Sequence, residues 1–207
     1  VTHSLSYQYL EPTYHTGLRV SYAASDAVSV SAGLVNGIYA NDTGTGDVTD
    51  AASQTFKNKG VELGLNWKMA DALSLAVSAY QGKTDIGHIS ADADQGVNQH
   101  LYSANLAYKV TDALNVAVSV DLSNGYDTAG SRDIESYTGY VTYALTDATK
   151  LGLRLEEINA STNAGAASVV LAHSFSDNFD LRTELTDVDP VHGDRDVRGA
   201  IQGVLKF

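Results

Sequence analysis

Cysteine is absent from the 207-residue chain, and several other features are scarce. Without cysteine there is no disulfide, no thiolate metal ligand and no cysteine nucleophile. Proline occurs twice, and no run approaches the ~18 apolar residues that indicate a membrane-spanning helix. Basic residues are few, since 13 Lys and Arg stand against 25 Asp and Glu, for a net charge of −12. This balance argues against nucleic-acid binding, which usually requires a basic patch.

The C-terminal segment shows a pattern that recurs along the chain. Odd positions from Val197 to Phe207 are apolar or glycine, whereas Asp196, Arg198 and Lys206 occupy even positions. Successive side chains of a strand point to opposite faces, so one face is apolar and the other charged. A single soluble sandwich strand can look like this, but its repetition along the chain is typical of a transmembrane β-barrel. A final strand that ends in Phe207 also resembles the assembly signal of bacterial outer-membrane barrels.

A short motif joins neighbouring alternating segments: a small residue, then Asp, then the start of the next alternation. Its copies are Ser25-Asp26, Ala70-Asp71, Thr111-Asp112, Thr146-Asp147 and Ser176-Asp177. Ser, Thr and Asp side chains favour tight turns because they bond to nearby backbone, so each copy predicts a hairpin. Longer polar stretches separate the hairpins, at 41–55, 84–96, 123–132, 159–165 and 187–194. Outer-membrane barrels show this asymmetry between short periplasmic turns and long extracellular loops.

The strand count follows from the turns. The five hairpins predict ten strands, and segments 3–9 and 197–207 add one each, for about twelve strands. We therefore expect one all-β domain over residues 1–207, a closed antiparallel transmembrane β-barrel. Closure removes the unpaired edges that lipid cannot solvate.

The aromatic residues are expected to form a girdle at one membrane interface. Six of them lie near the turn ends of the apolar face: Tyr22, Trp67, Tyr108, Tyr143, Phe175 and Phe179. Interfacial girdles of aromatic residues flank the apolar band of outer-membrane barrels. Tyr is also an ordinary strand former, which explains its abundance but not its position.

The charged face would then line the interior. The candidate pore-lining residues are Arg19, Glu62, Lys68, Lys109, Asp121, Arg154, Glu156, Arg182, Glu184 and Arg198. Three pairs of opposite charge lie two residues apart on one strand face: 154 with 156, 182 with 184, and 196 with 198. Facing acids and bases tune the selectivity of a pore. The alternative is a set of ion pairs that fills a closed interior.

A family resemblance extends this interpretation. Pro12, His15-Thr16-Gly17 and Val35-Asn36-Gly37 recur in the same arrangement in one family, as do Lys59 to Leu63 and Asn66 to Ser74. The chain resembles the OmpL-like β-barrel porin-2 family of Gram-negative bacteria. Members are usually much longer, and this chain looks like their C-terminal portion. The resemblance implies a lipid-embedded porin, with 10–16 strands if N-terminal strands are missing.

Catalytic and metal sites are weaker hypotheses. Outer-membrane phospholipases need a Ser beside a His base; here His88 and Ser90 fall in a polar loop, while His173 and Ser174 point to opposite strand faces. The acidic loop clusters, Asp42, Asp47 and Asp50 and then Asp85, Asp92 and Asp94, lack the spacing of a Ca²⁺ loop. We expect no enzymatic activity, no cofactor and no metal.

The predicted function is an outer-membrane porin, a passive diffusion channel for small polar or ionic solutes. The alternative is a plugged structural barrel whose long acidic loops bind a surface partner. The expected partners are membrane lipid, lipopolysaccharide, the barrel-assembly machinery and the transported solutes, with no nucleic acid. A homo-oligomer is left open.

Overall fold

The computed structural model describes residues 4–5, 17–36, 59–84, 97–124, 133–159, 163–190 and 194–206. These residues form one antiparallel sheet in which each strand pairs with the next along the chain, from β1 to β11. The strands are β1 (Gly17–Ala23), β2 (Val28–Asn36), β3 (Lys59–Ala70), β4 (Leu73–Thr84), β5 (Val97–Lys109), β6 (Leu114–Asn124), β7 (Asp133–Ala144), β8 (Thr149–Asn159), β9 (Ala164–Ser176), β10 (Phe179–Asp189) and β11 (Asp196–Leu205). The prediction of an all-β antiparallel fold is confirmed.

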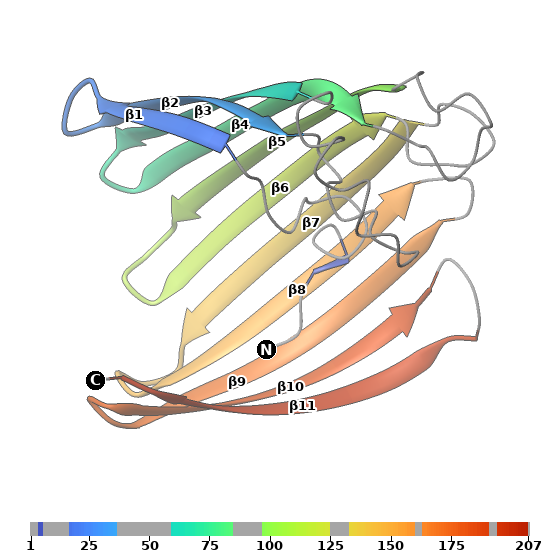
Figure 1. Ribbon diagram of the computed structural model, residues 1–207. Coiled ribbons are helices and arrows are strands. Elements are labelled where there is room, and N and C mark those ends of the chain that lie inside the picture. Colours follow the sequence, from blue (N-terminus) through green and yellow to red (C-terminus); the bar gives the residue numbers. More distant parts are fainter. Residues whose placement is uncertain are drawn as a thin grey trace.

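The sheet is strongly curved, so that one of its faces is concave and the other convex (Figure 1). Its two edge strands, β1 and β11, lie across from one another, and no pairing joins them among the described residues. The short turns gather at one end of the sheet and the longer connections at the other. The predicted closure into a barrel therefore stays a prediction, while the curvature and the two distinct ends are those that a barrel wall requires.

The period-two alternation of the sequence gives the sheet its two faces. Leu18, Val20 and Tyr22 of β1 are exposed, as are most large apolar residues on the same face of the other strands. The opposite face carries polar and charged residues, and on it lie most of the buried polar side chains, including Asp121 and Glu184. The chain end that carries Leu5 also lies on the concave side, so this polar face is the inner one. We call the two faces concave and convex below.

The predicted turns occur where the motif places them, and the hydroxyl rather than the Asp bonds to the backbone. Ser25 Oγ accepts hydrogen bonds from the N–H groups of Ala27 and Val28, at 3.2 and 3.1 Å. Thr111 and Thr146 repeat this geometry in their own turns. Ala70 has no hydroxyl, and there the register between β3 and β4 shifts between Lys68 and Ala70. Ser176 Oγ also accepts a hydrogen bond from the N–H of Asn178, at 3.3 Å, yet the register between β9 and β10 shifts at Phe179. A hydroxyl acceptor therefore does not by itself keep the register regular.

Two expectations about the chain were wrong in detail. The predicted strand over residues 3–9 is not formed at the two positions described, Ser4 and Leu5, while the eleven strands among the described residues agree with the predicted count of about twelve. The predicted loop 159–165 is also too long, because β8 ends at Asn159 and β9 begins at Ala164. Phe207 lies outside the described residues, as do all six positions of the two acidic loop clusters.

The buried apolar residues form two small clusters instead of one central core. One contains Val35, Tyr80 and Leu101. The other contains Leu5, Ile158, Ala164, Ala166 and Val188. Within the described part of the chain, no helix is long and apolar enough to cross a membrane.

Candidate functional site

The candidate pore-lining residues share the concave face. Across eight strand pairings, Lys68 is linked through Cα partners to Ser74, Ala107, Ala117, Tyr140, Arg154, Ser168, Thr186 and Arg198. A second row links Lys109 to Asn115, Thr142, Gly152, Val170 and Glu184. Paired residues of neighbouring strands point to the same side. The other candidates, Arg19, Glu62, Asp121, Glu156 and Arg182, belong to parallel rows on this face.

An ion pair on the concave face connects two strands that are not neighbours. Arg19 of β1 pairs with Glu62 of β3 through two contacts, Nε to Oε1 at 2.5 Å and one terminal guanidinium nitrogen to Oε2 at 2.7 Å. Gly33 of β2 lies between them in the row, opposite both. A Cβ at Gly33 would stand 2.5 Å from Glu62 Oε1, so the missing side chain makes room for the pair.

A second cluster centres on Arg154 of β8. Its Nε lies 2.7 Å from Glu156 Oε2, and a terminal guanidinium nitrogen lies 3.2 Å from Glu184 Oε1 of β10. The two carboxylate side chains are 1% and 0% exposed, and the arginine is 13% exposed. Ser168 and Thr186 complete the cluster by bonding to one another at 2.9 Å and to the arginine and Glu184 respectively. Buried charges require such compensation because their desolvation is costly.

Outside this cluster, the charges on this face are more exposed. Arg198 contacts Asp196 at 3.1 Å, with both side chains more than half exposed, as the spacing predicted. Lys206 contacts Asp180 at 2.8 Å. Glu184, predicted to pair with Arg182 two residues away, reaches Arg154 two strands away. The concave face therefore carries a buried charge cluster and, outside it, exposed charges towards both ends of the strands.

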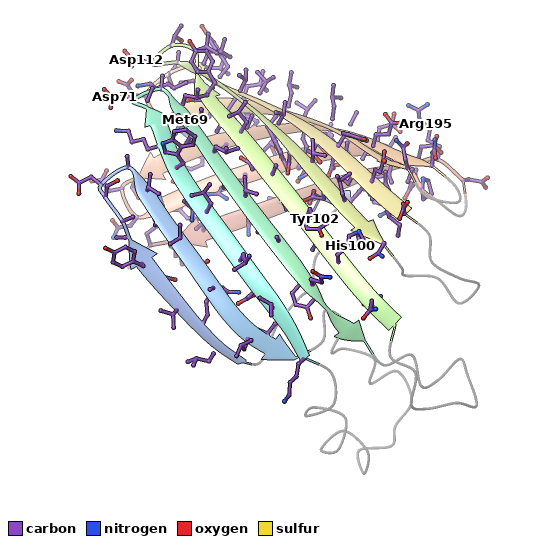
Figure 2. All side chains as sticks on the ribbon, turned by 90° about the horizontal axis from the view of Figure 1, so that it is seen from above. Met69, Asp71, His100, Tyr102, Asp112 and Arg195 are labelled. Atoms are coloured by element: carbon purple, nitrogen blue, oxygen red, sulfur yellow. The ribbon has the colours of Figure 1, made fainter. Side chains whose placement is uncertain are left out.

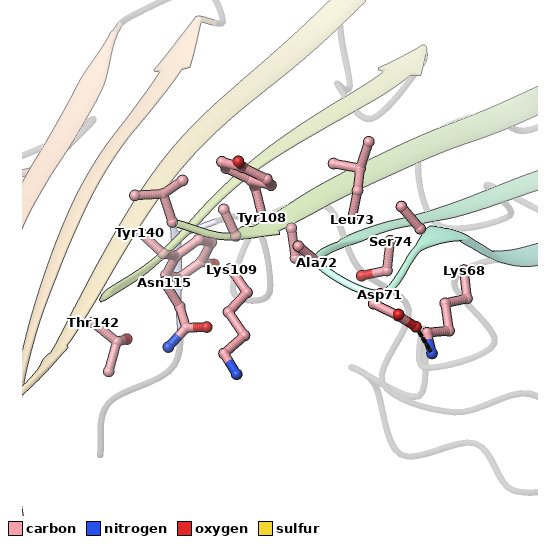
Figure 3. A pocket seen from close by; sticks show the side chains of 14 residues that line it. Lys68, Asp71, Ala72, Leu73, Ser74, Tyr108, Lys109, Asn115, Tyr140 and Thr142 are labelled. Carbon is pink, nitrogen blue, oxygen red and sulfur yellow. Dashed lines mark hydrogen bonds and ion pairs between the residues drawn. The ribbon is translucent and has the colours of Figure 1, made fainter. Parts of the chain in front are cut away.

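A shallow cavity of about 390 Å³ opens on the concave face at the turn end of β3 to β7. Its polar lining includes Lys68, Ser74, Lys109, Asn115, Tyr140 and Thr142 (Figure 3). Lys68 Nζ lies 2.8 Å from Asp71 Oδ1, and Lys109 Nζ lies 2.7 Å from Asp112 Oδ1. Each ammonium group lowers the pKa of its partner carboxyl below the ordinary range, first through the hydrogen bond and then through its charge. These exposed turn pairs leave two ammonium groups at the mouth of the concave side.

The six girdle candidates lie on the convex face or at its turn end. Tyr22, Trp67, Tyr108, Tyr143 and Phe175 are all exposed. Phe175 stacks on Phe179 of the next strand, with ring centroids 5.9 Å apart. Phe175 also falls at the register shift between β9 and β10, which ends the regular pairing next to the turn. The geometry is that of an interfacial belt, and the lipid contact itself stays a prediction.

A second group of aromatic residues was not identified from the sequence. Tyr102 and Tyr137 are exposed on the convex face towards the end with the longer connections. The ring of His100 lies 5.0 Å from that of Tyr102, and Tyr137 Oη donates to Glu135 at 2.8 Å. Figure 2 shows His100 and Tyr102 well away from Met69, Asp71 and Asp112 at the turn end. The alternation already placed both tyrosines outward, and only their distance from the turns set them apart.

The described residues do not assemble any of the catalytic sites considered above. As predicted, His173 and Ser174 have different surroundings: His173 Nδ1 lies 2.9 Å from Thr149 Oγ1, whereas Ser174 donates to Asp180 at 2.8 Å. His88, Ser90 and the acidic clusters at residues 42–50 and 85–94 lie outside the described residues. In the ranges that are described, no group of three or more His, Cys, Asp or Glu residues could hold a metal ion.

A curved antiparallel sheet with a polar inner face, and with an apolar outer face bordered by aromatic residues, is the architecture of outer-membrane channels. The OmpL-like β-barrel porin-2 family model matches residues 1–186, and the chain belongs to this family. The family resemblance is therefore confirmed. The protein is an outer-membrane channel for solute diffusion, and its family and fold indicate a channel instead of an enzyme. No curated protein sequence matches the chain.

Solved structures of porins share the fold. The outer-membrane channel DcaP of Acinetobacter baumannii is 13% identical, with a TM-score of 0.67 over 92% of this chain and 62% of that chain. The anion-selective porin of Comamonas acidovorans is 11% identical, with a TM-score of 0.63 over 82% and 47%. The KdgM porin is 15% identical, with a TM-score of 0.49 over 92% and 91%. This chain thus spans less than two thirds of the DcaP and Comamonas porin chains.

Proposed function

We propose that the concave face lines a watery passage for small polar and ionic solutes. The observation that carries the proposal is the separation of residue types: rows of charged and hydroxyl side chains inside, and apolar side chains outside. Solutes diffuse passively, and the charges named above filter them by size and sign. The filter comprises the exposed bases Lys68, Lys109 and Arg198, the bridge from Arg19 to Glu62, and the cluster around Arg154.

Closure of the wall, with residues 1–207 as one domain, is part of this proposal. Among the described residues no strand pairs with the outer edge of β1 or of β11. Unpaired backbone groups there would be costly in lipid, which cannot satisfy them. Contact with lipid and lipopolysaccharide, recognition of the final strand by the barrel-assembly machinery, and assembly into homo-oligomers also belong to the proposal. The convex aromatic belts support the lipid contact, since such belts mark membrane interfaces.

The alternative, a plugged structural barrel, has a specific observation in its favour. Asp121 and Ser136 of the concave face are 1% and 0% exposed, so part of the inner wall is covered. The bases at the turn end are exposed, which favours an opening there. A channel and a plugged barrel differ in whether these bases act on passing ions.

Ion selectivity of the folded protein in a planar bilayer separates the two. Lys68→Glu and Lys109→Glu each replace a base on the concave face by an acid. Both should shift the reversal potential in a KCl gradient towards cation preference. Arg195→Glu is the matched control, because it makes the same charge change on an exposed residue near the opposite end (Figure 2). Equal shifts for all three variants, or none, would contradict the proposed lining.

A further inference from the structure

An apolar patch interrupts the polar concave face. Ile158 of β8 pairs with Ala164 of β9, and Ala166 of β9 pairs with Val188 of β10. All four side chains are at least nine-tenths buried and form one cluster. Their neighbours along the strands are polar: Glu156, Ser168 and Thr186. An apolar patch inside a polar channel wall has no role in solvating ions, and its burial requires another part of the chain to cover it.

Leu5 covers the patch. Its side chain is 5% exposed and belongs to the same buried cluster, although it lies far from these strands in the sequence. Its backbone N–H donates to Glu156 Oε1 at 2.8 Å. The other oxygen of that carboxylate is paired with Arg154 Nε at 2.7 Å. The wall therefore offers Leu5 both an apolar surface and an acceptor whose orientation the arginine fixes; we call this arrangement the Leu5 seat.

We propose that Leu5, held in this seat, narrows the passage and sets its size limit. The inference rests on the proposed function, because it assumes that solutes pass along the concave face. Figure 1 shows the N-terminal end on the concave side, beside β8. A residue fixed there reduces the open cross-section. Leu5 is a specificity-determining residue, and Arg154 and Glu156 position it.

The test changes the seat without changing charge. Ala166→Asn adds bulk and a polar group to the patch, and Ala76→Asn makes the same substitution on the concave face of β4, away from Leu5. Leu5→Ser is the second variant, which leaves the wall intact. Ala166→Asn and Leu5→Ser should both raise single-channel conductance and admit larger polyethylene glycols. Ala76→Asn should behave like the unaltered protein.

Thiol labelling reports on the Leu5 seat independently of conduction. Because the chain contains no cysteine, a single introduced cysteine is the only thiol that can react. In a Leu5→Cys variant, a membrane-impermeant maleimide should react about tenfold more slowly than with Asp26→Cys at an exposed turn, because the seated side chain reacts only when it opens. Adding Ala166→Asn should remove this protection, and adding Ala76→Asn should not.

The outcomes separate the seat from the pore. Lost protection together with higher conductance supports the proposal, as does a silent channel that conducts only after Ala166→Asn. Rapid labelling of the Leu5→Cys variant overturns it, and so does lost protection with unchanged conductance and size limit. If no variant conducts current, both the constriction and the proposed pore are overturned. If Ala166→Asn and Leu5→Ser conduct with the same steps as the unaltered protein, only the constriction is overturned.

Discussion

Arg19 and Glu62 bridge β1 and β3 across the intervening strand, at the one position of β2 where a side chain would block them. Gly33 occupies that position, and its Cβ would lie 2.5 Å from Glu62 Oε1. The pair thus ties three strands together next to the edge of the sheet. Because β1 pairs with only one strand among those described, a second link to β3 adds to its attachment.

Gly33→Ala should weaken this link. The added methyl group displaces the Glu62 side chain, and we expect a loss of about 1 kcal/mol in the free energy of unfolding, as for other partly exposed pairs. Gly152→Ala is the control, because its Cβ would meet Val170 at an ordinary 3.6 Å on the same face. Urea unfolding followed by Trp67 fluorescence compares the two. Gly33→Ala at least as stable as Gly152→Ala would show that the bridge contributes nothing.

Arg154 and Arg198 offer a comparison between a buried and an exposed ion pair. Arg154→Gln removes the positive charge that two buried carboxylates share, and we expect it to cost about 3–5 kcal/mol. Arg198→Gln removes a pair that is more than half exposed and should cost less than about 1 kcal/mol. Adding Glu184→Gln to Arg154→Gln should recover part of the loss. Similar losses for both arginine variants would contradict the assigned burial.

Trp67 is the only tryptophan, so its fluorescence tests which face meets lipid. It lies on the convex face at the turn end, 40% exposed. We expect efficient quenching by lipids brominated near the headgroup and weak quenching by aqueous iodide. Moving the indole with Trp67→Phe and Val30→Trp should shift the strongest quenching towards lipids brominated deeper in the chains. Quenching by iodide alone would place the convex face in water.

The turn pairs predict a defined pH response. The hydrogen bond from Lys68 lowers the pKa of Asp71, so this pair contributes stability above the ordinary carboxyl pKa of about 3.9. That contribution is lost as the pH falls through the lower pKa of the folded state. Lys68→Met should return the pKa of Asp71 to its ordinary range and leave Asp112 unchanged, whereas Lys109→Met should do the reverse. Carbon-detected NMR titration of the two carboxyl groups measures both, and a shared response would refute separate pairs.

The strands and turns were predictable because their signals are local. Alternation fixes the face of each residue, and the Ser or Thr of the turn motif bonds to backbone two and three positions later. The same signals put the charged candidates on one face, where Arg154 contacts Glu156, and that this face lines a pore stays a prediction. Residue spacing within one strand is enough for such inferences.

Contacts across strands were not predictable in the same way. Glu184 reaches Arg154 because of the register between β8, β9 and β10, which no single strand encodes. The bridge over Gly33 likewise requires three strands in register. Leu5 was assigned to a strand because residues 3–9 alternate, and its place on the inner wall depends on side chains more than 150 positions away. Long-range packing decided these cases against local pattern.

The central claim is that the concave face encloses an open passage, and single-channel conductance of the refolded protein in a planar bilayer tests it most directly. The account predicts stable conductance steps whose ion selectivity changes with Lys109→Glu. A folded, membrane-inserted protein that carries no current, with or without the Leu5 seat intact, would contradict it and leave the plugged structural barrel.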